Sequence, residues 1–213
     1  MDDKKIALLE LRRDPLFHRI PSNRYDYYIE NSINIGKNIA SQYKGMEIKK
    51  LYKEHGIKVS YSENGNRMKS FQLRAEFIQK EGLNEVVLYK NSLNQLVEAW
   101  NEVFNPQVKL TYSEVENIHL AHEFHHYLEY NIFSPVEKQL DPVTTKTLFG
   151  KKKEQFVRQC SEIACHSFAK EILQLDYFPT LLDLTFLFFK GELDSEIASD
   201  IFGYKTFKER NKK

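Results

Sequence analysis

The chain has 213 residues, 41% of them hydrophobic and 29% charged, with 31 lysines and arginines against 30 aspartates and glutamates. Such a length and composition are those of a globular protein whose core is large enough to fold without a disulfide or a structural metal. The net charge of +1 is not the basic excess of proteins that coat nucleic acid or bind anionic membranes, so we expect neither as a partner.

No segment of the sequence predicts a signal peptide or a membrane span. The first twenty residues carry charges throughout, and the longest apolar stretch, residues 180–189, contains Asp183 and is only about half as long as a membrane span. Cys160 and Cys165 are five residues apart in one predicted helix, an offset that does not place two side chains face to face. We therefore expect a cytoplasmic protein without disulfides.

Helices are predicted for the first part of the chain. Residues 4–13 form a short helix ended by Asp14-Pro15, and residues 24–43 repeat apolar side chains at helical intervals. A third helix, over 46–55, is closed by a glycine at its C-terminus. We interpret residues 1–44 as an N-terminal helical extension and residues 45–213 as the main domain.

A β region follows these helices. Residues 57–61 are β-prone and end in a turn signal, and residues 71–77 alternate apolar and polar side chains, the pattern of a half-buried strand. A second turn at residues 80–82 leads to a third strand over 86–89. Three strands joined by turns predict a small meander or mixed sheet.

Helical periodicity returns after the strands. Residues 93–104 have one apolar face, typical of a packing helix. Ser113 and Glu116 form a capping-box signal that opens a helix running through Glu129. Three more helices are predicted, over residues 151–175, 180–190 and 194–202. The fold class is therefore α+β, with a small three-stranded sheet and additional helices at both ends.

The predicted helix over residues 113–129 carries an HExxH sequence, His122-Glu123-Phe124-His125-His126, within a cluster of four histidines. His122 and His126 are one turn and about 40° apart on a helix, so both imidazoles can bind one ion. Glu123 lies beside them and can act as general base on water activated by zinc. The opposite face is apolar and is predicted to pack: Leu120, Phe124, Tyr127 and Leu128. The alternative is a solvated, histidine-rich helix face.

A catalytic zinc needs a third protein ligand and an open coordination position. Glu162, on the next predicted long helix, is the best candidate, the alternative being an ordinary exposed glutamate. His166, one turn further on, is either a rival ligand, a donor to the transition state or a packed side chain. His125, Tyr127 and Tyr130 are further candidates for oxyanion support because they are close to the motif in sequence.

Two segments of the chain together resemble the ImmA/IrrE family of zinc metallopeptidases. They are I-H-L-A-H-E-F-H-H, from Ile118 to His126, and E-I-A-C-H-S-F-A-K-E-I-L, from Glu162 to Leu173. The family has an A-H-E-x-x-H helix and a second helix of the form E-x-x-A/C-N-x-F-A-x-x-L-L, whose first glutamate is the third metal ligand.

The resemblance implies a minimal zincin-like fold around the HExxH helix. His122, His126 and Glu162 are then the ligands of Zn²⁺, and Glu123 is the general base of a metallopeptidase. The implied substrate is a protein, typically a transcriptional repressor of the helix-turn-helix type.

Three features depart from the family pattern. His125 replaces a glycine, His166 replaces a frequent asparagine, and the helix over 93–104 is inserted before the active helix; none of these removes a ligand or the base. Two alternatives stay open: a metal-binding but catalytically weak regulatory or interaction module of the same fold, and a helical interaction protein whose histidines bind nothing. For a peptidase, we expect an edge strand, with 86–89 as the candidate, to align an extended substrate.

Overall fold

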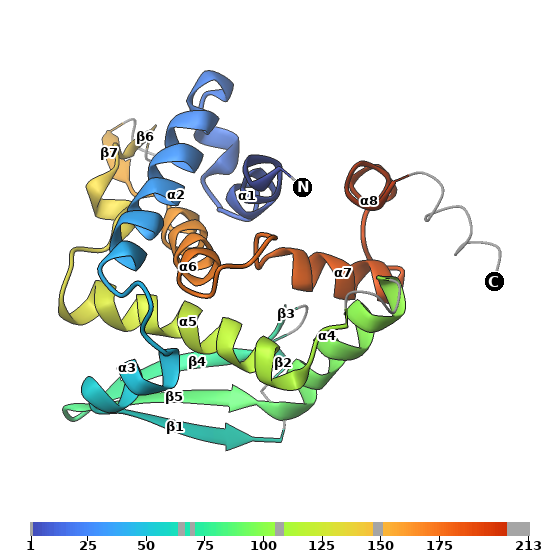
Figure 1. Cartoon of the computed structure of the whole chain (residues 1–213). Helices are drawn as coiled ribbons and strands as arrows, with labels where there is room; N and C mark the ends of the chain where they lie inside the picture. The colour runs from blue at the N-terminus through green and yellow to red at the C-terminus, as the bar shows by residue number, and fades with distance from the viewer. Residues whose placement is uncertain (1, 64–66, 69–70, 105–108, 147–150, 204–213) are drawn as a thin grey trace.

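The sheet, the histidine-bearing helix and the N-terminal helices lie in successive layers (Figure 1). In this computed structural model the described residues are 2–63, 67–68, 71–104, 109–146 and 151–203. They form an α+β structure, as predicted. Its helices are α1 (Asp3–Leu11), α2 (Tyr25–Ser41), α3 (Ile48–Glu54), α4 (Lys90–Val103), α5 (Tyr112–Asn131), α6 (Gln159–Ile172), α7 (Leu181–Lys190) and α8 (Ser195–Phe202). Its strands are β1 (Ile57–Ser62), β2 (Arg67–Met68), β3 (Phe71–Gln72), β4 (Ala75–Lys80), β5 (Leu83–Tyr89), β6 (Val143–Lys146) and β7 (Lys152–Gln155).

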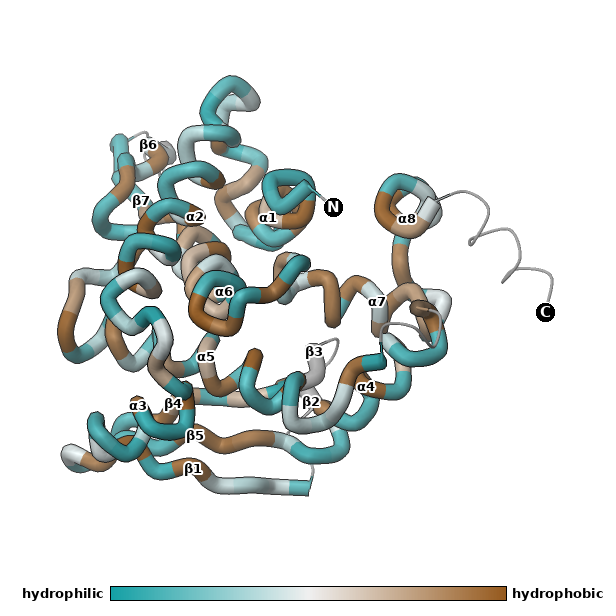
Figure 2. Tube along the Cα trace, in the orientation of Figure 1, coloured by the Kyte–Doolittle hydropathy of each residue, from teal (hydrophilic) through white to brown (hydrophobic). Residues whose placement is uncertain are grey.

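The main sheet is mixed, and its strand order is β1-β5-β4. β1 is parallel to β5, whereas β4 is antiparallel to it, with Phe77 opposite Val86. Glu81 and Gly82, with φ angles of 51° and 79°, form the tight turn between β4 and β5. Hydropathy colouring shows an apolar run along β5 (Figure 2), in keeping with a strand that has a neighbour on each side.

This strand order contradicts the prediction that residues 86–89 form an edge strand. They belong to β5, which is the central strand, and the edge strand in contact with α5 is β4. Apolar composition marked 86–89 as a strand correctly, but composition does not state how many neighbours a strand has.

The alternating segment 71–77 is not one strand. Residues 71–72 form β3 and pair with β2, and pairing with β5 begins only at Ala75. Between them lies Arg74, whose buried guanidinium contacts Asp183 on α7. The alternation of apolar and polar residues continues across this break. It depends only on which face of an extended chain each side chain occupies, and not on the strand with which each residue pairs.

The capping box of α5 is also two residues away from its predicted position. The Thr111 hydroxyl accepts a hydrogen bond from the Glu114 backbone N–H, and the Glu114 carboxylate accepts one from the Thr111 N–H. Glu116 contacts Lys49 and Tyr61 instead. Thr111 and Ser113 both precede a glutamate by three residues, so the local pattern fits both registers.

The predicted helix over 151–175 begins only at Gln159. Residues 152–155 form β7 and pair antiparallel with β6, so that a hairpin replaces the first part of the helix. The lysines and glutamate of this segment favour a helix by intrinsic propensity, and pairing with a neighbouring strand overrides that preference.

Helix α6 lies between α5 and the N-terminal helix α2 (Figure 1). α2 approaches α6 at Gly36, where a Cβ atom would be 2.3 Å from the Ala164 carbonyl oxygen. The Ser167 hydroxyl on α6 donates a hydrogen bond to the Ile33 carbonyl oxygen at 2.8 Å. The first two helices thus contribute to the hydrophobic core around α6, and the division of the chain after residue 44 stays a prediction.

Two further findings concern cysteines and membranes. Cys160 and Cys165 are free thiols buried in α6. None of the helices in the described ranges combines the length and the apolar character needed to cross a bilayer.

Candidate metal centre

Helix α5 presents the HExxH residues on the side opposite its packing face. Leu120, Phe124 and Leu128 are fully buried, and Tyr127 is 8% exposed, as the helical periodicity predicts. The ring centroids of His122 and His126 are 4.9 Å apart, and both side chains line a cavity of about 660 Å³. The two imidazoles therefore share a face with an open volume in front of them.

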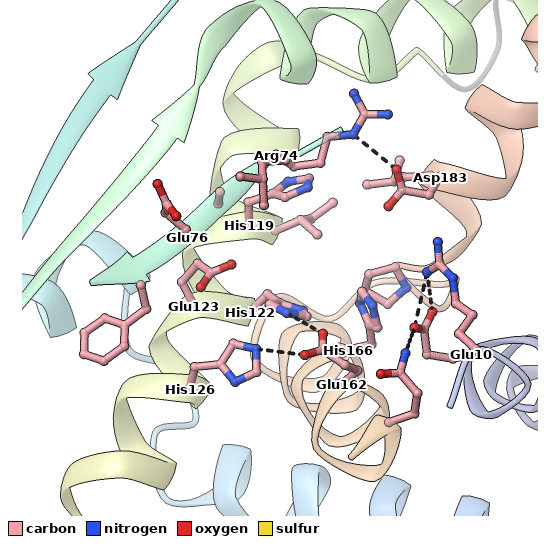
Figure 3. Close-up of a pocket in the computed structure, with 18 of the residues that line it drawn as sticks. Glu10, Arg74, Glu76, His119, His122, Glu123, His126, Glu162, His166 and Asp183 are labelled. Carbon is pink, nitrogen blue, oxygen red and sulfur yellow. Dashed lines mark hydrogen bonds and ion pairs between the residues drawn. The ribbon is translucent and has the colours of Figure 1, made fainter. Parts of the chain in front are cut away.

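Glu162 on α6 reaches both of these imidazoles (Figure 3). Its Oε2 is 3.3 Å from Nε2 of His122, and its Oε1 is 3.5 Å from Nε2 of His126. Ligand atoms about 2.0–2.1 Å from a tetrahedral zinc are themselves separated by about 3.3 Å. The predicted third ligand thus meets the other two, and two imidazoles with one carboxylate are a donor set that suits zinc.

The position of Glu162 depends on residues near the start of the chain. They are distant from α6 in sequence, but they contact its N-terminal end. Arg158, the residue before α6, provides no side-chain cap, and the free backbone N–H of Gln159 donates instead to the Asp14 carboxylate at 3.0 Å. The Gln159 side chain also donates to Glu10, at 2.7 Å. Residues from the end of α1 and from the loop after it therefore hold the N-terminal end of α6, where Glu162 lies.

The electrostatics of the three side chains favour a shared cation. Burial alone raises the pKa of Glu162, but its contacts with His122 and His126 outweigh burial and hold that pKa well below its ordinary value. Burial alone lowers the pKa of His126, and its contacts with Cys165, Glu129 and Glu162 reverse the effect, so this pKa lies well above the ordinary one. A positive charge between these side chains is thus favoured, and a metal ion can supply it.

Glu123 lines the same cavity without touching Glu162. Its side chain lies between His122 and strand β4 (Figure 3), and the residue is 7% exposed. Burial raises its pKa, although the neighbouring imidazoles and the Phe77 backbone N–H partly oppose this shift. A buried carboxylate with a raised pKa beside the two histidines is suited to take and return a proton.

The candidates for oxyanion support are divided by the structure. His166 and Tyr130 line the cavity, and the His166 ring lies 4.6 Å from the His122 ring. His125 is completely buried against Cys165, and Tyr127 packs against Phe124, so neither faces the cavity. Of the four side chains, only His166 and Tyr130 are placed to contact a bound substrate.

Additional donor atoms surround the three predicted ligands. One group of possible metal donors combines His122 and His126 with Cys165, and another combines His122 and Glu162 with His166. Burial raises the pKa of the Cys165 thiol well above its ordinary value, so binding of an ion by this sulfur requires the loss of its proton. Burial likewise lowers the pKa of His166 well below its ordinary value, which keeps its ring neutral.

Sequence inspection missed several residues that shape the centre. Glu129 contacts His126 from behind, and its offset of three residues on the same helix could have revealed it. Glu10, Arg13 and Asp183 also line the cavity. They come from α1, the following loop and α7, and no local pattern links them to the motif.

No protein-family model, no curated protein and no solved structure matches this chain. The resemblance to the ImmA/IrrE family therefore stays a prediction based on the two motif segments.

Proposed function

We propose that this protein is a zinc-dependent metallopeptidase with a minimal zincin-like fold, which hydrolyses peptide bonds in a protein substrate. The observation that carries this proposal is the convergence of His122, His126 and Glu162 in one cavity, with Glu123 beside them. Two imidazoles and a carboxylate with a neighbouring buried glutamate form the side-chain set of a hydrolytic zinc centre.

Each side chain has a separate role in this proposal. His122, His126 and Glu162 hold the ion, which when bound supplies the Lewis acidity that activates water and polarises the scissile carbonyl group. Glu123 takes a proton from the water as the water oxygen forms a C–O bond with the scissile carbonyl carbon, and then gives this proton to the nitrogen of the leaving amine as the C–N bond breaks. His166 and Tyr130 are the candidates for donating a hydrogen bond to the developing negative charge.

The outer edge of β4 is the proposed guide for an extended substrate. The Arg74 carbonyl oxygen accepts a hydrogen bond from the Tyr89 N–H, and residues alternate in direction along an antiparallel strand. The backbone groups of Ala75 and Phe77 are thus directed away from β5, and both residues line the cavity. The Phe77 N–H is engaged by the Glu123 carboxylate, which leaves the Ala75 groups and the Phe77 carbonyl oxygen for a substrate. A peptide added along this edge passes in front of the histidine pair.

The class of protein substrate rests on the motif resemblance alone. We propose a transcriptional repressor with a helix-turn-helix domain as the substrate.

The decisive experiment compares wild-type protein with Glu123→Gln. Both proteins are loaded with zinc and incubated with labelled casein and with the product of a neighbouring regulator gene. We expect equal zinc content, cleavage by the wild type, and a loss of about 10²- to 10⁴-fold in the variant, because a general base contributes about this much.

Three results of this experiment would each contradict one part of the proposal. If the wild type binds zinc but cleaves neither casein nor the regulator, the metal-binding regulatory or interaction module is indicated instead. Equal cleavage by both proteins excludes Glu123 as the base. A wild-type protein that binds no stoichiometric metal contradicts the metal centre itself.

A further inference from the structure

His126 is held between two carboxylates that contact opposite nitrogens of its ring. Nε2 faces Glu162 at 3.5 Å, on the side of the cavity. Nδ1 faces Oε2 of Glu129 at 3.2 Å, on the side of the protein interior. Glu129 is 3% exposed and is not one of the residues that line the cavity. It therefore touches the histidine from behind and not the space in front of it.

Glu129 is itself fixed by groups from three elements. The Ser161 hydroxyl on α6 donates a hydrogen bond to Oε2, the atom that faces His126. The Val136 backbone N–H, from the turn over Val136–Gln139, donates to Oε1 at 2.9 Å. Nδ1 of His125 lies 3.6 Å from Oε2. The carboxylate thus has a defined orientation, with one oxygen aimed at His126.

This arrangement has a chemical consequence for the ring. A neutral imidazole carries one proton, and the nitrogen that keeps it is decided by the hydrogen bond that nitrogen can make. A buried carboxylate at Nδ1 retains the proton there and leaves the lone pair on Nε2, where the candidate ion binds. The same hydrogen bond limits rotation of the ring and makes Nε2 a stronger donor.

We propose that Glu129 is a positioning residue for the metal centre: it holds His126 in the Nδ1–H form, aims Nε2 at the ion, and is held in turn by Ser161. Because Ser161 directly precedes Glu162 in α6, one network sets the positions of two ligands on two helices. The inference rests on the metal centre of the proposed function and is independent of peptide hydrolysis.

A purely structural role for Glu129 is the competing explanation. It contacts His125 and ties α5 to α6 and to the Val136 turn, so its loss lowers stability whether or not a metal binds. The two explanations differ in what they predict for the affinity of a folded variant for zinc, and for the proton on Nδ1.

The test measures zinc affinity by competition with a chromophoric chelator, with Glu129→Leu, Glu129→Gln and Ser161→Ala compared with the wild type. We expect Glu129→Leu to weaken zinc binding by about 10- to 100-fold, the range found when such outer contacts of a ligating histidine are removed. Glu129→Gln keeps the shape but not the charge, and we expect about a tenfold loss. Ser161→Ala removes only one hydrogen bond from the carboxylate, and we expect about a two- to tenfold loss.

Glu116→Gln is the matched control. Glu116 is another buried carboxylate on α5, where it contacts Lys49 and Tyr61 and does not line the cavity. We expect its zinc affinity to stay within about twofold of the wild type even where thermal unfolding shows a comparable loss of stability.

A spectroscopic readout separates positioning from stability. In zinc-loaded protein with ¹⁵N-labelled histidine, we expect an Nδ1 proton of His126 that exchanges slowly in the wild type and rapidly in Glu129→Leu. Should Glu129→Leu fail to fold, Ser161→Ala carries the test through the same two measurements. Wild-type zinc affinity and an unchanged Nδ1 proton in these variants would overturn the inference alone, whereas a wild type that binds no zinc would overturn both it and the metal centre.

Discussion

The carboxylate of Glu162 and the imidazole of His122 meet across two helices, with Oε2 and Nε2 separated by 3.3 Å. Neither residue has this neighbour until α6 has packed on α5. The candidate metal centre therefore depends on the packing of α6 against α5 as well as on the chemistry of its ligands.

Replacement of Glu162 tests this relationship. We expect Glu162→Gln to lose stoichiometric zinc, with a fall in affinity larger than the roughly 10- to 100-fold typical of contacts beyond the ligands, because an anionic ligand is removed. Elemental analysis and chelator competition measure the effect. Glu171→Gln, at an exposed position of the same helix, is the control and keeps its zinc; equal zinc in both variants would exclude Glu162 as a ligand.

Gly36 is the point at which α2 packs closely on the ligand-bearing helix. A Cβ atom there would lie 2.3 Å from the Ala164 carbonyl oxygen. Because this oxygen belongs to the backbone of α6, no change of side-chain rotamer can relieve the clash. We expect Gly36→Ala to lower the free energy of unfolding by roughly 1–3 kcal/mol, as overpacking does, despite the better helix propensity of alanine. Denaturant unfolding measures this change.

Asn38→Ala is the control for this substitution, because Asn38 is exposed on the same helix. We expect it to leave stability within about 0.5 kcal/mol of the wild type. A Gly36→Ala protein as stable as Asn38→Ala would show that α2 and α6 are not in close contact at this point.

The edge of β4 can be tested with a residue that removes one backbone donor. Ala75→Pro deletes an N–H directed away from β5, at the kind of edge position where proline is tolerated. We expect kcat/KM for a peptide substrate to fall by about 3- to 10-fold, the worth of one hydrogen bond, with zinc affinity unchanged. Ala75→Val keeps the N–H and is the control; equal activities of the two variants would argue against substrate alignment on β4.

The stability of the metal-free protein should depend on the charge of His119. Burial lowers the pKa of His119 to about 4 from 6.5, while Nδ1 contacts the Val115 carbonyl oxygen at 2.8 Å. The unfolded chain therefore binds this proton at a higher pH than the folded one, and the stability that the neutral ring contributes is complete above pH 6.5 and lost between pH 6.5 and pH 4.

Unfolding curves of wild type and His119→Gln at several pH values measure this dependence. We expect the wild type to lose stability more steeply than the variant as the pH falls from 6.5 to about 4. The difference between the two proteins isolates His119 from the other buried histidines. Parallel stability profiles would contradict the lowered pKa.

Sequence-based predictions were accurate for features set by neighbouring residues and less accurate for features set by contacts between distant residues. The spacing of His122, Glu123 and His126 on one helix depends on a few consecutive residues, and the structure places all three as expected. The sequence alone could not decide between capping boxes at Thr111 and Ser113, because each residue is followed by a glutamate three positions later. Contacts of Glu116 with Lys49 and Tyr61, which are distant in sequence, leave Thr111 and Glu114 as the capping pair.

Strand pairing was the main source of error. The segment 71–77 is divided between two partners, residues 152–155 leave a predicted helix to pair with β6, and residues 86–89 lie at the centre of the sheet and not at its edge. Glu129 was missed for a different reason: its offset from His126 was visible in the sequence, but an acid on a helix surface is ordinary until its burial is known.

The sequence by itself determined the α+β class, most of the helices and the face on which the histidine pair lies, because helical periodicity is a property of neighbouring residues. Only the tertiary structure decided that Glu162 meets this pair, that β4 is the edge beside it, and that Glu129, bonded to Ser161, contacts His126 on the interior side. These relations come from helix crossing and strand pairing between distant segments, and the burial that accompanies them gives otherwise ordinary carboxylates their particular environments.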